Sequence, residues 1–377
     1  MITIPGRIEN LKPYQPGKPI GELLREKKLH RIVKLASNEN PLGPSPKAIK
    51  AITEKSTGVH HYVDPASTEL VEALAKKYNK QPNQIICGHG VDSILGIILV
   101  ACSLEDDEVL TSAGSFIGIY VNTNKYGRKL TLVELKNYKI DLDGILAGIS
   151  RNTKIIYLAN PNNPTGTIFT RNQFETFMAK VPDNILVILD ESYTEYALLK
   201  ADFPDGMNYD NDNLIVTRSL SKVYGLAGLR IGFAVGPGYI IKELYKAKLP
   251  FEPNYLAQIG AIAALEDDDF LNRTLEVNKK SLEMMVEKFD ELEIKYIKTS
   301  TNFILLLMPS EKFAADFFEE CLKIGLIVRH VKSFGIPSGI RINSGTEEET
   351  IFALDVIEKV YQDLSKNHEI KNLEARK

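Results

Sequence analysis

The chain has 377 residues, of which 44% are hydrophobic and 25% charged, so it can bury the core of one large domain and a smaller one. Its formal net charge of −3 gives no reason to expect nucleic acid or an anionic membrane as a partner. Its three cysteines lie far apart, which excludes a disulfide framework and a C-x-x-C metal site, and its longest apolar stretch, residues 94–102, is too short to cross a bilayer. These features predict a cytoplasmic protein without a metal.

The first two thirds of the chain alternate between apolar runs and amphipathic segments. Runs that predict strands lie at residues 84–87, 108–111, 130–133, 154–158, 185–189, 214–217 and 231–235. Helical patterns lie between several of them, at 67–78, 94–102 and 171–179. Such alternation predicts an α/β domain with a mainly parallel seven-stranded sheet covered on both faces.

The pattern changes after Pro250. Residues 255–292 have helical periodicity, and short strands at 302–307, 325–329 and 340–342 then alternate with helices at 312–323 and 347–364. We therefore expect a large domain at residues 46–260, and an N-terminal arm (1–45) that joins residues 261–377 in a smaller α+β domain.

The most informative motif is Thr217-Arg-Ser-Leu-Ser-Lys-Val-Tyr-Gly-Leu-Ala-Gly-Leu-Arg-Ile-Gly232. Lys222 lies in a turn of small residues, where a lysine can form a Schiff base with an aldehyde. Ser219, Ser221 and Arg230 supply hydroxyl and guanidinium donors for a phosphate dianion beside it. An aldehyde that carries a phosphate is pyridoxal phosphate, although S-x-S-K alone is equally consistent with a solvated surface loop.

Two further motifs follow predicted strands, where an α/β sheet presents its ligands. The turn Asn160-Pro-Asn-Asn-Pro-Thr-Gly166 holds Asn163 in one place, suited to donate to a phenolate oxygen. In Asp190-Glu-Ser-Tyr193, a partly desolvated Asp190 would favour a cationic partner such as a protonated pyridine nitrogen, with Tyr193 nearby. An ordinary turn and an ordinary helix-capping aspartate are the alternatives.

Two weaker signals complete the predicted site. The stretch Gly88-His-Gly-Val-Asp-Ser93 opens an apolar helix, so the free amides of Val91, Asp92 and Ser93 predict a phosphate site at the positive end of the helix dipole. Phe116 follows a predicted strand and can stack on a planar ring. A turn that needs its glycines, and a core phenylalanine, are the simpler interpretations.

The chain resembles the fold-type I, pyridoxal-phosphate-dependent aminotransferases, and in particular their histidinol-phosphate aminotransferase branch. The resemblance covers nearly the whole chain in the same order. It rests on the segments Leu11–Tyr14, Ala36–Pro41, His61–Pro65, Pro161–Gly166, Asp190–Tyr193, Ser219–Lys222 and Arg341–Thr346.

The resemblance implies a role for each matching residue. Lys222 would be the lysine that binds the cofactor aldehyde, Asp190 the partner of the ring nitrogen, and Asn163 and Tyr193 the donors to its phenolic oxygen. The cofactor phosphate would be held by Ser219, Ser221, Arg230, the amides of Val91, Asp92 and Ser93, and Tyr62 of a neighbouring subunit, which implies a homodimer. The substrate would be bound by Tyr14, Asn38, Asn163, Arg329 and Arg341.

Two departures from the family pattern affect the substrate side. The chain has Ser112-Ala-Gly-Ser-Phe116 where the family usually has a proline, and Pro250-Phe-Glu-Pro253 where Pro-Phe-Asn-Val is common. A phosphate dianion needs several charged or hydroxyl donors, which Arg341, Arg329 and Tyr14 can supply, so histidinol phosphate with 2-oxoglutarate is the expected substrate pair.

Other functions stay open at this point. An aromatic amino acid aminotransferase shares much of the pattern, and a decarboxylase of a phosphorylated amino acid can use the same scaffold. A ligand sensor without turnover is the alternative from another class. Such a protein would normally have lost a catalytic residue or gained a DNA-binding segment, and this chain keeps Lys222, Asp190, Asn163, Tyr193 and Arg230 without a basic appendage.

Overall fold

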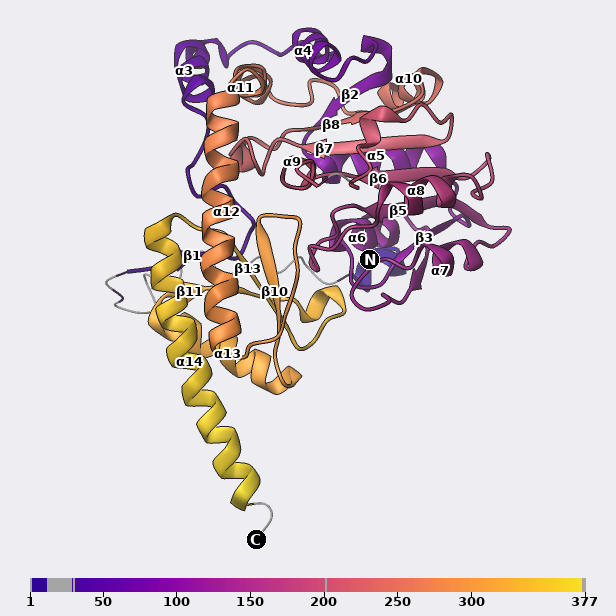
Figure 1. Cartoon of the computed structure of the whole chain (residues 1–377). Coiled ribbons are helices and arrows are strands. Elements are labelled where there is room, and N and C mark those ends of the chain that lie inside the picture. The colour runs from indigo at the N-terminus through magenta and orange to yellow at the C-terminus, as the bar shows by residue number, and fades with distance from the viewer. Residues whose placement is uncertain (1, 12–28, 30, 201, 375–377) are drawn as a thin grey trace.

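A computed structural model describes residues 2–11, 29, 31–200 and 202–374 of the chain, and only the backbone of residues 367–374. Tyr14, which the sequence predicts to bind substrate, lies outside the described residues. Figure 1 shows a large α/β part, with a smaller part beneath it from which the long C-terminal helix projects.

The large part is built on a seven-stranded sheet, as the sequence predicts. Its strands are β2 (Ile85–Gly88), β3 (Glu108–Ser112), β4 (Lys129–Val133), β5 (Thr153–Ala159), β6 (Leu186–Asp190), β7 (Leu214–Ser219) and β8 (Gly232–Val235). Their order is β2-β8-β7-β6-β5-β3-β4; β8 runs antiparallel to β2 and β7, and the other neighbouring pairs are parallel. The carboxyl ends of β3, β5, β6 and β7 therefore meet at one edge.

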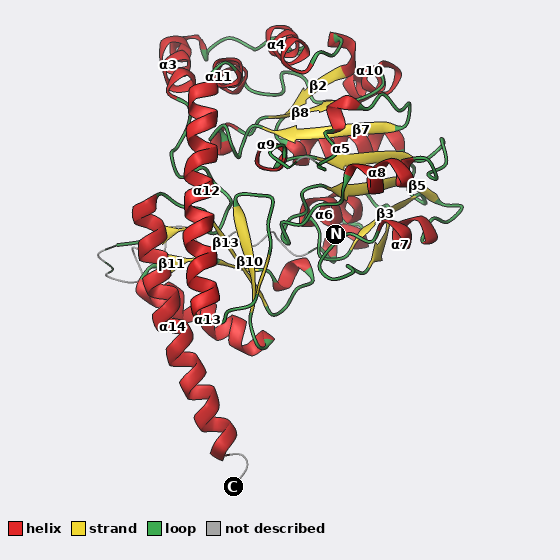
Figure 2. Ribbon diagram, viewed as in Figure 1, coloured by secondary structure: helices red, strands yellow, loops and turns green. Residues whose placement is uncertain are grey.

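Helices cover both faces of this sheet (Figure 2). They are α3 (Pro46–Lys55), α4 (Thr68–Tyr78), α5 (Val91–Cys102), α6 (Ile117–Lys125), α7 (Leu142–Ala147), α8 (Arg171–Met178), α9 (Thr194–Ala197), α10 (Gly238–Ala247) and α11 (Tyr255–Leu265). Alternate residues of a strand point to opposite faces. Ile156 and Leu158 of β5 accordingly belong to the core beneath α4, α8 and α11, whereas Ile155 and Tyr157 belong to the core beneath α5 and α10.

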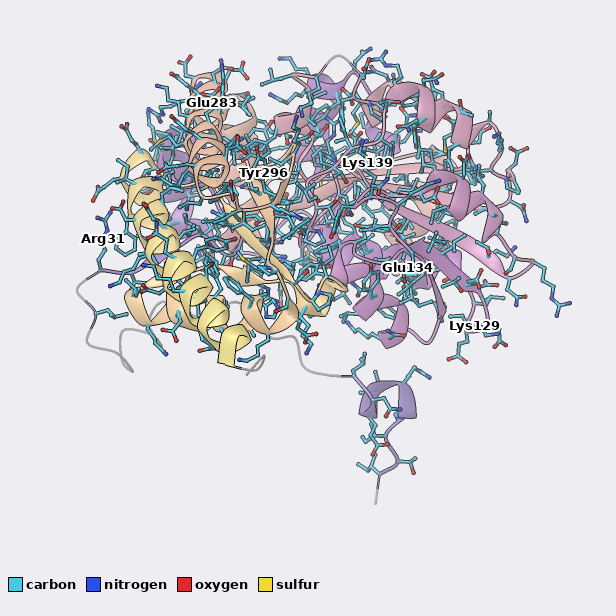
Figure 3. The ribbon with its side chains drawn as sticks, turned by 60° about the horizontal axis from the view of Figure 1, so that its bottom comes forward. Arg31, Lys129, Glu134, Lys139, Glu283 and Tyr296 are labelled. Atoms are coloured by element: carbon cyan, nitrogen blue, oxygen red, sulfur yellow. The ribbon has the colours of Figure 1, made fainter. Side chains whose placement is uncertain are left out.

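The edge strand β4 is more polar than the central strands. Lys129 is exposed on it and lies near the edge of the molecule in Figure 3, and the exposed Glu134 follows at the end of the strand. Charged side chains on an edge strand oppose pairing with another chain. By contrast, every residue of β6 and β7 is buried, which is typical of central parallel strands.

The smaller part combines an antiparallel sheet with three long helices. Its sheet has the order β12-β13-β10-β9, and a second pair joins β1 of the N-terminal arm to β11 in parallel. The elements are β1 (Val33–Lys34), β9 (Tyr296–Ile297), β10 (Phe303–Leu307), β11 (Leu326–Ile327), β12 (Arg329–His330), β13 (Gly339–Asn343), α12 (Asp268–Glu291), α13 (Glu311–Ile324) and α14 (Glu347–Glu374). A short helix, α1 (Gly6–Glu9), lies near α6.

The predicted single strand at 325–329 is two strands, because the segment changes partner: β11 pairs with β1 and β12 pairs with β13. The last helix also continues past the expected end at residue 364, to Glu374. None of the helices within the described residues combines the length and the apolar character that a membrane crossing requires.

Two hydrophobic cores indicate how the chain divides. Ala257 and Ala261 of α11 belong to the core of the large sheet, and Leu271 packs against it from the first turns of α12. Met285 and Phe289, later in α12, belong to the core of the small sheet. The division at residues 260 and 261 stays a prediction; the packing favours a boundary farther along, within α12.

Candidate active site

A cavity of about 530 Å³ lies at the carboxyl edge of the large sheet and is closed on one side by the small part. Among the residues that line it are most of those that the sequence singles out: Asn38, Val91, Asp92, Phe116, Asn163, Asp190, Tyr193, Ser219, Ser221, Lys222, Arg230, Arg329 and Arg341. The structure thus brings together residues that lie far apart in the sequence, from Asn38 to Arg341.

Lys222 lies in the turn that follows β7. The Ser219 hydroxyl accepts from the amide of Ser221 at 3.1 Å, and the Gly225 amide donates to the Lys222 carbonyl at 3.0 Å, so both ends of the turn are fixed. Gly225 has a φ of +68°, and a Cβ there would overlap the carbonyl oxygen of Gly43. The Lys222 ammonium lies 5.7 Å from the centre of the Tyr193 ring.

Asp190 ends β6 as a buried carboxylate that neutral groups hold in place. The Tyr157 hydroxyl donates to its Oδ2 at 2.6 Å, and the Ser192 amide and hydroxyl donate to its Oδ1 at 3.0 and 2.6 Å. Burial raises the pKa of Asp190, and the bonds from Ser192 and Tyr157 lower it in part. A cationic group bound beside this carboxylate would relieve the cost of its burial.

The sequence reasoning did not identify Tyr157 or Ser192. Tyr157 lies on β5, next to β6, and its side chain leaves the strand on the face that also carries Ile155. In the sequence, Tyr157 is one more residue of the apolar run 154–158, and nothing in that run distinguishes it from a core residue. Ser192 lies two residues after Asp190. An aspartate often accepts from the backbone amide two positions farther on, so the sequence could have predicted this contact.

Amide and phenol groups converge beside Asp190. The Tyr193 hydroxyl accepts from the Asn38 side chain at 2.7 Å and from the Asn163 side chain at 3.5 Å. Arg341 donates to Asn163 Oδ1 at 2.6 Å and to the carbonyl of Ala36 at 2.8 Å. The bond from Arg341 fixes the Asn163 side chain with its amide nitrogen toward the Tyr193 hydroxyl, and both residues line the cavity.

The amino terminus of α5 forms an anion site at the other end of the cavity. Its cap residue is Gly90, which has no side chain to accept from the helix, so the first-turn amides keep their capacity to donate. The Arg230 guanidinium lies alongside: a Cβ on Gly90 would lie 2.7 Å from its Nη2. Arg230 itself has a φ of 56°, a left-handed conformation that directs this side chain toward the helix end.

Asp92, in the first turn of α5, introduces a negative charge at this site. Its carboxylate is 3.9 Å from the Arg230 guanidinium, and the two side chains are 50% and 42% exposed. Burial raises the pKa of Asp92, while Arg230 and Lys222 lower it. The contact with Arg230 is loose, which is consistent with a guanidinium that can turn to a bound anion.

Two predicted residues do not face the cavity with their side chains. The Ser93 hydroxyl donates to Glu252 instead. The prediction for Ser93 concerns its backbone amide at the phosphate site, and this contact leaves that amide unaffected. Tyr62 is 84% exposed and stacks on Phe251, with the ring centres 4.3 Å apart. Its expected action on a neighbouring subunit stays a prediction.

The two predicted substrate arginines are direct cross-strand partners. Arg329 of β12 pairs with Arg341 of β13, and both side chains line the cavity. The Phe334 ring lies 6.0 Å from the Arg329 guanidinium and 5.8 Å from that of Arg341. Like charges directly opposite on a sheet repel, so a bound anion between them would stabilise this pair.

The arrangement fits a ligand that has a phosphate, an aldehyde and a basic ring nitrogen. The uncapped helix end and Arg230 suit the phosphate, the buried Asp190 carboxylate suits a protonated nitrogen, and Lys222 lines the same cavity. Together with the sheet topology, it places the chain in the class of pyridoxal-phosphate-dependent transferases of fold type I.

Comparisons with known proteins narrow this class. The family model described as aminotransferase class I and II matches residues 30–357, and the chain belongs to that family. It is 39% identical over 355 residues to the histidinol-phosphate aminotransferase of Caldicellulosiruptor saccharolyticus, covering 94% of this chain and 98% of that one. It is also 39% identical to one from Akkermansia muciniphila, covering 93% and 96%.

A solved structure supports the same family. The crystal structure of histidinol-phosphate aminotransferase from Sinorhizobium meliloti in complex with pyridoxal-5′-phosphate superposes with a TM-score of 0.88 and 27% identity, covering 95% of this chain and 97% of that one. An aspartate aminotransferase from Thermus thermophilus, at 21% identity and a TM-score of 0.82, shares the fold.

Proposed function

We propose that the chain is a pyridoxal-phosphate-dependent aminotransferase that converts L-histidinol phosphate and 2-oxoglutarate to imidazole acetol phosphate and L-glutamate. The observation that carries the choice of substrate is the cross-strand pair Arg329–Arg341, which puts two guanidinium groups on one wall of the cavity. Two cations suit a phosphate dianion better than a single carboxylate, which needs about one bidentate arginine. The two relatives that are named histidinol-phosphate aminotransferase support this choice of substrate.

When bound, pyridoxal phosphate supplies an aldehyde that condenses with amines and a ring that withdraws electrons from the Cα–H bond of the amino substrate. Asp190, held by Tyr157 and Ser192, would keep the ring nitrogen of the bound cofactor protonated. Asn163 and Tyr193 would donate to its phenolic oxygen. Lys222 Nζ would take the proton from Cα of the amino substrate as a general base and give it up again as a general acid; water would supply the oxygen of the keto product, and the amino group would stay with the bound cofactor.

The same residues serve the second half of the reaction. The keto acid 2-oxoglutarate enters the cavity after the first product has left, and Lys222 moves the proton in the opposite direction. The distal carboxylate of 2-oxoglutarate can use the arginines that hold the phosphate. The kinetics should therefore follow a ping-pong scheme, in which each substrate meets the enzyme alone.

An aromatic amino acid aminotransferase is the second candidate. Phe116 and Phe334 line the cavity and offer apolar contact to a side-chain ring, and the substrate carboxylate would then bind Arg341. This alternative gives Arg329 no anion to bind. The two functions therefore differ in what they require of Arg329.

Substitution of Arg329 by alanine separates the two candidates. The variant loses a charge-assisted contact of about 1.5 to 3 kcal/mol, so kcat/KM for histidinol phosphate should fall by about ten- to a hundredfold. Phenylalanine and tyrosine should be affected much less, because their single carboxylate still meets Arg341. Single-turnover rates of the amino-donor half-reaction measure the loss on histidinol phosphate and the loss on the two aromatic amino acids.

Lys332→Ala is a matched control, because this lysine lies three residues farther on, outside the cavity lining, and pairs with Glu311 at the surface. It should leave both substrates unaffected. Equal losses on all donors in Arg329→Ala would assign the arginine a structural role. Faster turnover of aromatic amino acids than of histidinol phosphate by the unmodified enzyme would favour the second candidate.

We further propose a homodimer in which Tyr62 reaches the cofactor phosphate of the neighbouring subunit, in the cytoplasm. The exposure of Tyr62 and its stacking on Phe251, whose own side chain is 43% exposed, support this proposal, since an aromatic pair on the surface favours a protein partner.

Mixed dimers test the arrangement of the two chains. Tyr62→Ala and Lys222→Ala subunits should each be inactive or nearly so. If Tyr62 and Lys222 of one site come from different chains, a hybrid dimer holds one intact site, and mixing should recover up to about a quarter of the activity, since half the dimers are hybrids with one site in two. No recovery, with subunit exchange shown by labelled subunits, would place Tyr62 in its own chain's site or in none.

A further inference from the structure

The segment between α10 and α11 holds a carboxylate against the amino terminus of α5. Glu252 is 9% exposed, and its Oε1 accepts from the backbone amide of His89 at 2.7 Å and from the hydroxyl of Ser93. These two donors lie on either side of Gly90, the cap residue of the helix. One carboxylate oxygen thus joins the loop before α5 to its first turn.

The same segment is joined to the second half of the anion site. The Asn254 side chain donates to the carbonyl of Leu229 at 3.1 Å, directly before Arg230. Phe251, on the other side of Glu252, stacks on Tyr62. The segment therefore contacts the helix end and the backbone that carries the arginine.

The opposite side of the helix end is closed by β8. A Cβ on Gly232 would lie 2.9 Å from the amide nitrogen of Val91, so β8 lies close to that amide and can do so because residue 232 has no side chain. The position of the first turn of α5 depends accordingly on β8 on one side and on Glu252 on the other.

We propose that Glu252 is a positioning residue that sets the geometry of the cofactor-phosphate site, an inference that rests on the proposed function. Glu252 is not among the residues that line the cavity. A negative charge near a phosphate is unfavourable, so what Glu252 contributes is acceptance of two hydrogen bonds, which aims the amides of α5 at the anion.

Titration of the apoenzyme with two ligands tests this role. Pyridoxal phosphate reports on the whole site, and pyridoxal, which lacks the phosphate, reports on the rest of it. Glu252→Ala should weaken the binding of pyridoxal phosphate by about tenfold, because it leaves two partly buried donors unpaired, and should leave the binding of pyridoxal nearly unchanged. Glu252→Gln keeps an acceptor oxygen without the charge, and should bind pyridoxal phosphate as tightly as the native protein or more so.

Two further variants sharpen the test. Ser93→Ala removes one of the two donors and should cost about threefold in affinity for pyridoxal phosphate only. Glu243→Ala removes a glutamate of α10 that pairs with Lys246 at the surface, and should change neither ligand. Thermal unfolding of each apoenzyme shows whether a variant is folded before it is titrated.

The outcomes separate the inference from the proposed function. If the native protein binds pyridoxal phosphate no better than pyridoxal, the phosphate site itself is wrong. If that preference is present but Glu252→Ala keeps it, or loses affinity for both ligands equally, Glu252 does not position the site. A loss in Glu252→Gln as large as in Glu252→Ala would overturn the hydrogen-bond account.

Discussion

Replacement of Lys222 by alanine is expected to lower the rate of transamination by about four orders of magnitude or more, because it removes both the amine that meets the cofactor aldehyde and the group that moves the proton. The fold should persist, since the side chain makes an ammonium contact with the Tyr193 ring rather than a core contact. Pyridoxal phosphate should still bind, because the substitution leaves Arg230 and the end of α5, the proposed phosphate site, unchanged. Half-reaction rates with histidinol phosphate measure the loss.

Reductive trapping identifies the reacting lysine directly. Treatment of the native enzyme and its cofactor with borohydride, followed by peptide mapping, should find the pyridoxyl group on Lys222. Lys125 also lines the cavity and is the matched control: Lys125→Ala should keep the label on Lys222, and Lys222→Ala should lose it. A label on Lys125 or on any other lysine would contradict the assignment.

The sequence predicts the large sheet well because its central strands are buried on both faces. Runs such as 185–189 and 214–217 are continuous and apolar, and the structure places β6 and β7 there within two residues. The order of the strands does not follow from the runs, because it depends on which faces of distant helices pack together. The antiparallel direction of β8 between β2 and β7 is an example.

The short strands of the small part are harder to predict for a physical reason. A two-residue strand such as β11 exists because β1, almost three hundred residues earlier, lies beside it, and no local periodicity records that pairing. The long α12 was expected as part of one helical stretch at 255–292, whereas the structure ends α11 at Leu265 and caps α12 with the Asp267 side chain.

Motifs reveal site residues that touch a ligand more readily than those that support them. Asp190 and Lys222 lie at strand ends in recognisable patterns, and the structure puts both in one cavity. Tyr157 and Glu252 instead contact other residues of the protein. Tyr157 donates to Asp190, 33 positions along the chain, and Glu252 accepts from His89 and Ser93, which lie 163 and 159 positions before it. Their roles become visible only when the chain is folded.

Asp190→Asn should give an enzyme that binds its cofactor and turns over more slowly by about two to three orders of magnitude, the size typical of losing one preorganised charge in an active site. A neutral amide cannot hold the ring nitrogen protonated, while its oxygen can still accept from Ser192. The pH dependence of the half-reaction and the absorbance of the bound cofactor report on this loss. Activity close to that of the native enzyme would contradict the role of Asp190.

The thermal stability of the Asp190→Asn apoenzyme provides the control, because the substitution should lower the activity but should not lower the stability of the fold. Burial raises the pKa of Asp190 in the folded apoenzyme, so the unfolded chain ionises first and the stability of the fold decreases as pH rises from the unfolded value, near 3.8, toward the raised one. Asparagine removes this cost. The apoenzyme of Asp190→Asn should therefore unfold at the same temperature as the native apoenzyme or higher at pH 7, and the two should converge below about pH 4. A less stable variant at pH 7 would mean that the hydrogen bonds from Tyr157 and Ser192 outweigh the cost of burying the charge.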